Sequence, residues 1–231
     1  MEQNLLQLED IMDYYISSMP CADREDVSRG MLEAFARHAL FLRKSVDWCR
    51  QLPVEVFLEN VAAYRVNSER IEDCRHWFYE MVMPLLSGLT LKEAILEVNL
   101  WCCANAGYHQ ADERTANAVA VYKSGYGRCG EESTFAVTVL RSVGIAARQV
   151  YAPLWSHCDD NHAWVEVWCD GLWQYFGACE PEPVLNKGWF DLPASKAMLI
   201  HGRTFGESKG QQETVGRDIG DTEQRRYIEF I

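Results

Sequence analysis

A cysteine with glycines close on both sides is the first candidate for chemistry in this chain. Residues 127–133 read Gly-Arg-Cys-Gly-Glu-Glu-Ser, so the thiol of Cys129 is closely flanked by glycine. The residues that follow predict a helix over 129–142, ended by Gly144, which would place Cys129 at the positive end of the helix dipole. That position favours the thiolate, the nucleophilic form of cysteine. The alternative is a small buried thiol without a chemical role.

A histidine later in the chain could serve as the partner of this thiol. His162 follows the turn-forming residues 159–161 and begins a stretch, 162–169, whose side chains alternate in character as in a strand. A histidine at the end of a rigid strand can take a proton from a thiol on a facing helix. Together the two residues form a Cys/His nucleophile pattern. The alternative is a histidine hydrogen-bonded to its own loop.

A carboxylate usually orients the imidazole in such patterns. The pair Asp170-Gly171 predicts a two-residue hairpin turn that leads into a second strand over 172–178. Because adjacent antiparallel strands bring the end of one beside the start of the other, Glu180 is the best-placed acid. The alternative is a solvated turn residue before Pro181.

The elements that must position these residues are mostly helices. Apolar residues at three- and four-residue steps predict helices over 5–19 and 31–42, and Pro53 could begin a third. A fourth is expected over 68–83, stopped by Pro84, and Thr90 and Glu93 form a capping box that opens a fifth. A strand is expected over 146–151. Helices followed by antiparallel strands make this an α+β protein.

The chain divides into three predicted parts. Residues 1–110 form a helical region that packs on or covers the core, and residues 111–206 form the core that carries Cys129 and His162. Residues 207–231 are polar and glycine-rich, and their last five residues resemble a strand that is cut short. This tail could be the start of a truncated segment.

Composition excludes several classes of function. The 231 residues carry a net charge of -12, which argues against a nucleic-acid partner or an anionic membrane. No run approaches the ~18 apolar residues of a membrane span, and the acidic N-terminus is unlike a secretory signal. None of the nine cysteines forms a C-x-x-C pair, which argues against structural zinc and fits reduced thiols in the cytoplasm. We therefore expect a cytoplasmic protein without a cofactor.

Two other clusters offer weaker alternatives. The loop 157–162 contains histidine, cysteine, aspartate and asparagine, but ligands from one short loop cannot easily surround a metal ion. The many Trp and Tyr residues after position 150 could form a platform for stacking sugars. Alternating aromatic residues on strands are more often sheet packing.

Three ordered motifs carry a family resemblance. GRCGEES around Cys129, RSVGIAARQVY after it and NHAWVEVW around His162 make residues 122–190 resemble the transglutaminase-like superfamily of papain-related thiol enzymes. The stretch GACEPEPVLNKGWF is similar to the peptide N-glycanase branch, where the segment reads D-A-C-E and later reaches G-W. The resemblance implies a transglutaminase-like core: a nucleophile helix packed on an antiparallel sheet, preceded here by the helical region.

The chain departs from the family pattern in two places. The usual aspartate lies four residues after the strand tryptophan, and four residues after Trp173 this chain has Gly177. Glu180 could substitute through its longer side chain, or it could contact substrate while a carbonyl or water holds His162. The zinc-binding cysteine pairs of peptide N-glycanases are also missing, which argues against equating the chain with those enzymes.

The resemblance implies a thiol hydrolase or acyltransferase that attacks an amide in a peptide, protein or glycopeptide. Cys129 would form a thioester, with His162 as base and then acid, and hydrolysis is preferred because nothing marks an acyl-acceptor site. The alternatives are a binding module that has lost turnover, or a protein-glutamine amine transferase. The oligomeric state is left open.

Further site candidates follow from the same resemblance. The backbone N–H of Cys129 would meet the oxyanion together with a side-chain donor from the preceding helix, where Trp101 and Asn99 lie. The alternative for Trp101 is a core tryptophan. Independently of the resemblance, proximity in sequence makes Tyr126, Arg128, Glu131 and Trp164 rim candidates, and each could instead have a structural role.

Overall fold

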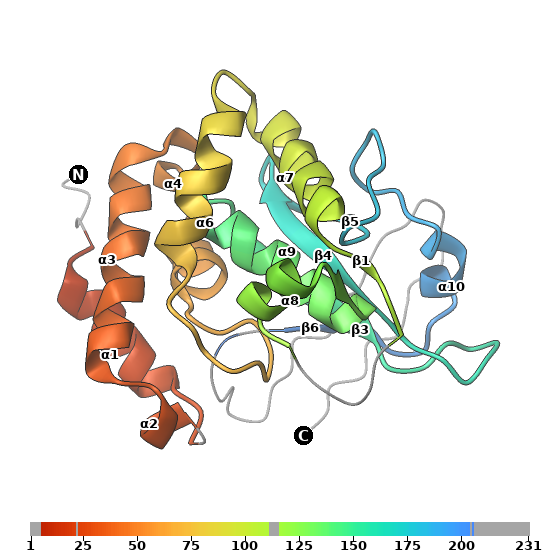
Figure 1. The fold of residues 1–231 in the computed structure, drawn as a ribbon, viewed down its shortest axis with the longest axis horizontal. Helices are drawn as coiled ribbons and strands as arrows, with labels where there is room; N and C mark the ends of the chain where they lie inside the picture. The colour runs from red at the N-terminus through yellow and green to blue at the C-terminus, as the bar shows by residue number, and fades with distance from the viewer. Residues whose placement is uncertain (1–5, 22, 111–115, 204, 206–231) are drawn as a thin grey trace.

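The protein has the α+β architecture that the sequence predicts, with helices first and an antiparallel sheet after them (Figure 1). The computed structural model describes residues 6–21, 23–110, 116–203 and 205. The helices are α1 Leu8–Ser18, α2 Asp23–Asp26, α3 Arg29–Ser45, α4 Asp47–Arg50, α5 Val54–Phe57, the π-helix η1 Leu58–Ala62, α6 Arg75–Val82, the 3₁₀ helix η2 Met83–Leu86, α7 Leu91–Asn105, α8 Ala118–Ser124, α9 Cys129–Ser142 and α10 Asp191–Ser195. The strands are β1 Gly107–Tyr108, β2 Tyr126–Gly127, β3 Ala147–Ala152, β4 His162–Cys169, β5 Leu172–Phe176 and β6 His201–Gly202.

The main sheet has the strand order β5-β4-β3-β6, with antiparallel neighbours throughout. Its predicted hairpin is confirmed, because Asp170 and Gly171 both have positive φ, at 56° and 78°, as a tight two-residue turn requires. β4 has its predicted bounds, and β3 begins one residue later than expected. β5 ends two residues early, because Gly177 starts a turn that bridges back to Glu180.

Helix α9 is the centre of the molecule and has the bounds that the sequence predicts. It packs against β3 and β4 on one side and against α6, α7 and α8 elsewhere. Every residue from Glu131 to Ser142 is buried. Gly144 follows it with a φ of 81°, and a Cβ there would lie 2.9 Å from the Cβ of Cys49 in α4. Glycine is therefore required both by the backbone conformation and by the close approach.

The helices before the sheet contribute to two apolar cores. One core gathers α1, α3 and η1 around residues such as Tyr15, Phe35 and Phe57, at the end of the molecule opposite α10 (Figure 1). The other joins α6 and α7 to α9 and β4. The capping box of α7 is confirmed, since the N–H of Thr90 donates to Glu93 Oε2 at 2.8 Å. The division at residue 110 stays a prediction, and the tail 207–231 with its predicted strand lies outside the described residues.

The predicted helix over 68–83 was wrong in its first half, because α6 begins only at Arg75. The cause is the carboxylate of Glu69, which accepts the backbone N–H groups of Val66 at 2.8 Å and Asn67 at 2.7 Å. These bonds satisfy the backbone locally in a non-helical conformation. Pro84 also does not end the helical segment, because the chain continues through it as the 3₁₀ helix η2.

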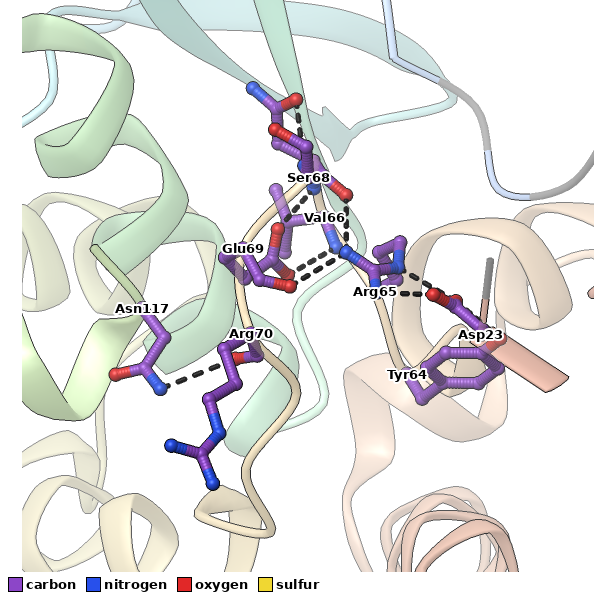
Figure 2. A network of polar contacts seen from close by, with 9 residues as sticks. Asp23, Tyr64, Arg65, Val66, Ser68, Glu69, Arg70 and Asn117 are labelled. Atoms are coloured by element: carbon purple, nitrogen blue, oxygen red, sulfur yellow. Dashed lines mark hydrogen bonds and ion pairs between the residues drawn. The ribbon is translucent and has the colours of Figure 1, made fainter. Parts of the chain in front are cut away.

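Arg65 ties this non-helical segment to its surroundings (Figure 2). Its guanidinium donates to the backbone oxygens of Asn67 at 3.0 Å and Glu69 at 2.6 Å, and it pairs with Asp23, the first residue of α2. The backbone oxygen of Arg65 in turn accepts from the buried guanidinium of Arg141 in α9, at 2.9 Å. The segment is therefore anchored to α9 and to the N-terminal helices.

We expect the protein to lose stability as the pH falls from about 6.5 to about 4. Burial lowers the pKa of His38 to about 4, while Nε2 is hydrogen-bonded to the backbone oxygen of Ser142 at 2.9 Å. The unfolded chain has an ordinary histidine pKa of about 6.5 and so binds more protons in this window, which favours unfolding. Urea titrations at about pH 7 and about pH 4.5 should show His38→Gln losing about 1–2 kcal/mol less than wild type.

The matched control is His157→Gln, which changes an exposed histidine and should keep the wild-type loss. Equal losses in wild type and His38→Gln would contradict the assignment. Some loss should remain in His38→Gln, because burial also lowers the pKa of His162 to about 4.

Candidate active site

A pocket of about 730 Å³ lies where the N-terminus of α9 meets the start of β4. Cys129, His162 and Glu180 all line it, so the fold brings together the three residues that the sequence predicts to carry catalysis. They come from the first residue of α9, the first residue of β4 and the turn after β5. The arrangement brings a thiol, an imidazole and a carboxylate into one pocket, the combination of a Cys/His nucleophile site.

The thiol of Cys129 rests in its neutral form. Burial raises its pKa above the ordinary value, and Glu132 and Asp160 add to this, although the sulfur accepts hydrogen bonds from the backbone N–H groups of Ala163 and Gly130. The sequence-based expectation that the helix N-terminus favours the thiolate is therefore corrected. Loss of solvent around the sulfur outweighs the dipole and the two hydrogen bonds.

The imidazole of His162 is also neutral at physiological pH. The residue is only 6% exposed, and burial lowers its pKa to about 4 against the opposing charge of Asp160. Its ring lies 4.7 Å from that of Trp189 and 4.9 Å from that of Phe190, between centroids. Nε2 is buried without a hydrogen-bond partner in the described part of the chain, and no hydrogen bond there joins it to Cys129.

Glu180 is connected to the imidazole through the side chain of Trp189. Both of its carboxylate oxygens accept from the Nε1–H of Trp189, at 3.0 and 2.9 Å, and the ring of Trp189 packs on His162. Burial raises the pKa of Glu180, and the bond from Trp189 opposes that rise. The described hydrogen bonds of Glu180 do not include one to His162.

Gly177 explains how this site differs from the family pattern. A Cβ at Gly177 would lie 3.0 Å from the Cβ of Glu180 and would meet its Oε2. The carboxylate of Glu180 therefore occupies the space into which a side chain at position 177 would extend. An aspartate at 177 and the present conformation of Glu180 exclude one another.

Asn99 of α7 holds the turn that carries Glu180. Its Nδ2 donates to the backbone oxygen of Gly177 and its Oδ1 accepts from the N–H of Cys179, both at 3.0 Å. Cys179 has a φ of 58°, an uncommon conformation for a residue with a side chain, which these contacts help to hold. Asn99 lies beside the predicted oxyanion donor in sequence, but its side chain is used for this turn.

Sequence reasoning missed Gln149 of β3, which is 1% exposed and lines the pocket. Its Nε2 donates to the backbone oxygen of Gly130 at 2.8 Å and to Ser133 Oγ at 2.7 Å, both in the first turns of α9. Its Oε1 accepts from Asn67 Nδ2 at 2.7 Å. The only signal in the sequence was a polar residue within a predicted strand. That signal was not enough to predict its role, because all its hydrogen-bond partners are distant along the chain.

The structure does not bring Trp101, Tyr126 or Trp164 to the pocket wall. The ring of Trp101 stacks on that of Tyr122 at 5.7 Å, within the helical core. Trp164 is fully buried on the same strand as His162, two residues further on. Tyr126 of β2 pairs with Gly107 of β1, and its ring lies 5.2 Å from that of His109, between centroids. These three residues are therefore unsuited to contact a ligand in this pocket directly.

The other rim candidates do line the pocket. Arg128 and Glu131 form the cap of α9, where the N–H of Arg128 donates to Glu131 Oε2 at 3.0 Å. Of the aromatic residues after position 150, Tyr151 and Trp189 are at the pocket wall. The pocket thus combines aromatic, amide and charged side chains around the thiol.

Neither a metal cluster nor a membrane span is found in the described ranges. No three His, Cys, Asp or Glu side chains within residues 6–21, 23–110, 116–203 and 205 could together hold a metal ion. No helix among those residues is both long and apolar enough to cross a bilayer.

Comparison with known proteins identifies the fold. Residues 85–178 match the family model of the transglutaminase-like superfamily, and this stretch contains α7, α9, β3, β4 and β5. The core is a transglutaminase-like fold, and the match together with the Cys/His site supports a cysteine-dependent enzyme. No curated protein sequence matches the chain.

A solved structure with some similarity is that of a candidate cysteine protease from Cytophaga hutchinsonii. It is 17% identical, with a TM-score of 0.39 over 68% of this chain and 54% of that one. The present chain thus spans about half the length of that protein.

The neutral thiol predicts slow alkylation of Cys129 up to alkaline pH. Burial, with the charges of Glu180 and Glu131, raises the pKa of Glu132 to about 8, so its ionisation above that pH adds a negative charge near the sulfur. Glu132→Gln should therefore speed alkylation several-fold at about pH 9, where wild type carries that charge. Iodoacetamide labelling followed by peptide mass spectrometry measures each thiol separately, with the exposed Cys21 and Cys158 as references. Rapid alkylation of Cys129 near pH 6 would contradict the neutral pair.

Because Gln149 supports the first turns of α9, we expect its substitution to cause a local loss of order in that helix. Gln149→Leu leaves the backbone oxygen of Gly130 and the amide of Asn67 without these partners, so the free energy of unfolding should fall by about 1–3 kcal/mol. Hydrogen exchange should accelerate at residues 129–133. Gln174→Leu on β5 is the control, because its side chain bonds the backbone oxygen of Cys169 instead. Unchanged exchange at 129–133 in Gln149→Leu would refute the role.

Proposed function

We propose that this protein is a cysteine-dependent amide hydrolase in which Cys129 is the nucleophile and His162 transfers the proton. The observation that carries the proposal is the pocket shared by these two residues, in which the neutral imidazole keeps Nε2 without a partner in the described chain. A neutral histidine can accept a proton and then return it, which a protonated one cannot. The match to the transglutaminase-like superfamily supports the same class of chemistry.

The reaction begins with transfer of the thiol proton of Cys129 to His162 as the sulfur attacks the amide carbonyl. A sulfur–carbon bond forms, the carbon–nitrogen bond breaks, and the amine leaves with the proton from the imidazole. Water then attacks the thioester while His162 takes one of its protons, which releases a carboxylic acid and restores the thiol. A resting neutral pair suits this scheme, because the charges appear only as the substrate reacts.

The oxyanion of this reaction would be met by the N-terminus of α9. The first N–H groups of a helix have no partner within it, and that of Cys129 lies next to the reacting sulfur. Trp101 is not proposed as the second donor, because its ring is stacked on Tyr122.

Glu180 is proposed as a positioning residue that takes the place of the family aspartate. Its carboxylate fills the space above Gly177 and holds the indole of Trp189, which packs on the imidazole. The contact between Glu180 and His162 is indirect, so Glu180 would affect the orientation of the imidazole more than its protonation. The glycanase likeness of the same segment makes N-glycopeptides one substrate to test, beside ordinary peptides.

Two other functions remain as alternatives. A binding module without turnover is favoured by Gly177, which stands at the position of the family aspartate, and by the neutral thiol. A protein-glutamine amine transferase would use an amine in place of water to resolve the thioester. One experiment separates all three.

The protein is incubated with a mixed peptide library and N-glycopeptides, with and without a dansylated primary amine, and products are read by mass spectrometry. We expect cleavage or deamidation products without amine incorporation. Cys129→Ser should abolish them and His162→Gln should lower the rate by about 100-fold or more. Glu180→Gln should lower it by about tenfold, because it keeps the shape and weakens the hold on Trp189.

Cys103→Ser is the matched control, because this half-buried thiol lies outside the pocket. Amine incorporation that depends on Cys129 would favour the transferase. Product formation that persists in Cys129→Ser would overturn the proposal, and binding of substrates without any product would favour the binding module.

A further inference from the structure

Two exposed aromatic side chains face the pocket from different parts of the chain. Tyr108 of β1 is 65% exposed and Trp189, just before α10, is 60% exposed, and both line the pocket of Cys129. Large aromatic side chains usually bury much of their surface. Rings left open at a pocket wall therefore offer apolar faces to a ligand.

Two carboxylates accompany these rings. Asp160, in the loop before β4, and Glu180, after β5, line the same pocket. Asp160 is held in place, since its Oδ1 accepts from the N–H of Asn161 at 2.8 Å and its backbone oxygen accepts from the N–H of Trp155 at 2.9 Å. No basic side chain forms an ion pair with Asp160 or Glu180 within the ranges that the structure describes.

Neither of the two arginines that line the pocket pairs with Asp160 or Glu180 in the part of the chain that the structure describes. Arg128 belongs to the cap of α9, where its Nε lies 3.9 Å from Glu131 Oε2. Arg203 follows β6, on the far side of β3 from β4, and its N–H donates to the backbone oxygen of Gln149 at 2.8 Å. The pocket-lining residues Tyr108, Asp160, Glu180 and Trp189, which we call the acidic wall, therefore include two carboxylates without an ion-pair partner among the described residues.

An independent observation at the same pocket is a buried polar atom without a partner. His162 lines the pocket, is 94% buried, packs its ring 4.7 Å from that of Trp189 of the acidic wall, and has no partner for Nε2 among the described residues. A buried polar atom without a partner is rare in a folded protein and calls for an explanation such as a functional role.

We propose that the acidic wall is a subsite for a guanidinium-bearing side chain of a polypeptide substrate, next to the amide that Cys129 attacks. The inference rests on the proposed function, which it deepens by naming the substrate class. A guanidinium stacks on aromatic faces and forms paired hydrogen bonds with a carboxylate, so it matches both features of the wall. A neutral ureido group of similar shape has fewer N–H donors and brings no positive charge to the carboxylates.

The test is protection of Cys129 from iodoacetamide by two small probes, arginine amide and citrulline amide, which differ at the guanidinium. Arginine amide at millimolar concentration should slow alkylation at least threefold, and citrulline amide should have little effect. Each variant is compared with and without probe, because Asp160 itself raises the pKa of the thiol and so changes the basal rate. The protection should weaken at high salt, since the wall is open to solvent.

Asp160→Asn should lose most of the protection, whereas Asp159→Asn should keep it. Asp159 is the matched control, because it is exposed in the same loop and does not line the pocket. Tyr108→Leu, which removes one aromatic face, should lose part of it. Equal protection by the two probes, or equal behaviour of the two aspartate variants, would overturn the subsite.

This readout needs no turnover, so it separates the subsite from the hydrolase. Charge-selective protection without any product in the hydrolysis experiment would support the subsite and refute the catalytic role. Products formed equally from arginine- and citrulline-containing peptides would support the hydrolase and refute the subsite.

Discussion

The burial of α9 is the constraint on which the rest of the structure depends. The helix is enclosed by the sheet and by three other helices, so each polar group that it carries must find a partner inside the protein. Gln149 meets this need at the first turns through Gly130 and Ser133, and Arg141 does so at the other end through backbone oxygens of residues 63, 65 and 147. Packing and hydrogen bonding thus hold Cys129 at one defined place.

The same burial determines the charge state of the site. Enclosing the thiol and the imidazole disfavours their charged forms, so the pKa of Cys129 rises and that of His162 falls to about 4. Carboxylates around them add to the effect on the thiol. The resting site is consequently neutral at the reacting pair and acidic at its wall. The neutral pair suits the proposed hydrolysis, and the acidic wall suits the proposed preference for a cationic group.

The turn after β5 is held by contacts with residues that are distant in the sequence. With glycine at 177, the chain can close a tight turn and fold Glu180 back over it. Asn99 holds that turn from a separate helix, and Trp189 contacts both the carboxylate of Glu180 and the ring of His162.

Local pattern in the sequence determined α9, β4, the hairpin turn and the capping box of α7, because helix periodicity, strand alternation and turn residues act over a few neighbours. The motifs also pointed to Cys129 and His162. Only the tertiary structure decided that Glu69 and Arg65 keep residues 68–74 out of a helix, and that Gln149 supports α9. It alone placed Tyr108 at the pocket while Trp101 stays in the core, and it alone made the thiol neutral. These features rest on contacts between residues far apart in the chain and on burial, which no short stretch of sequence contains.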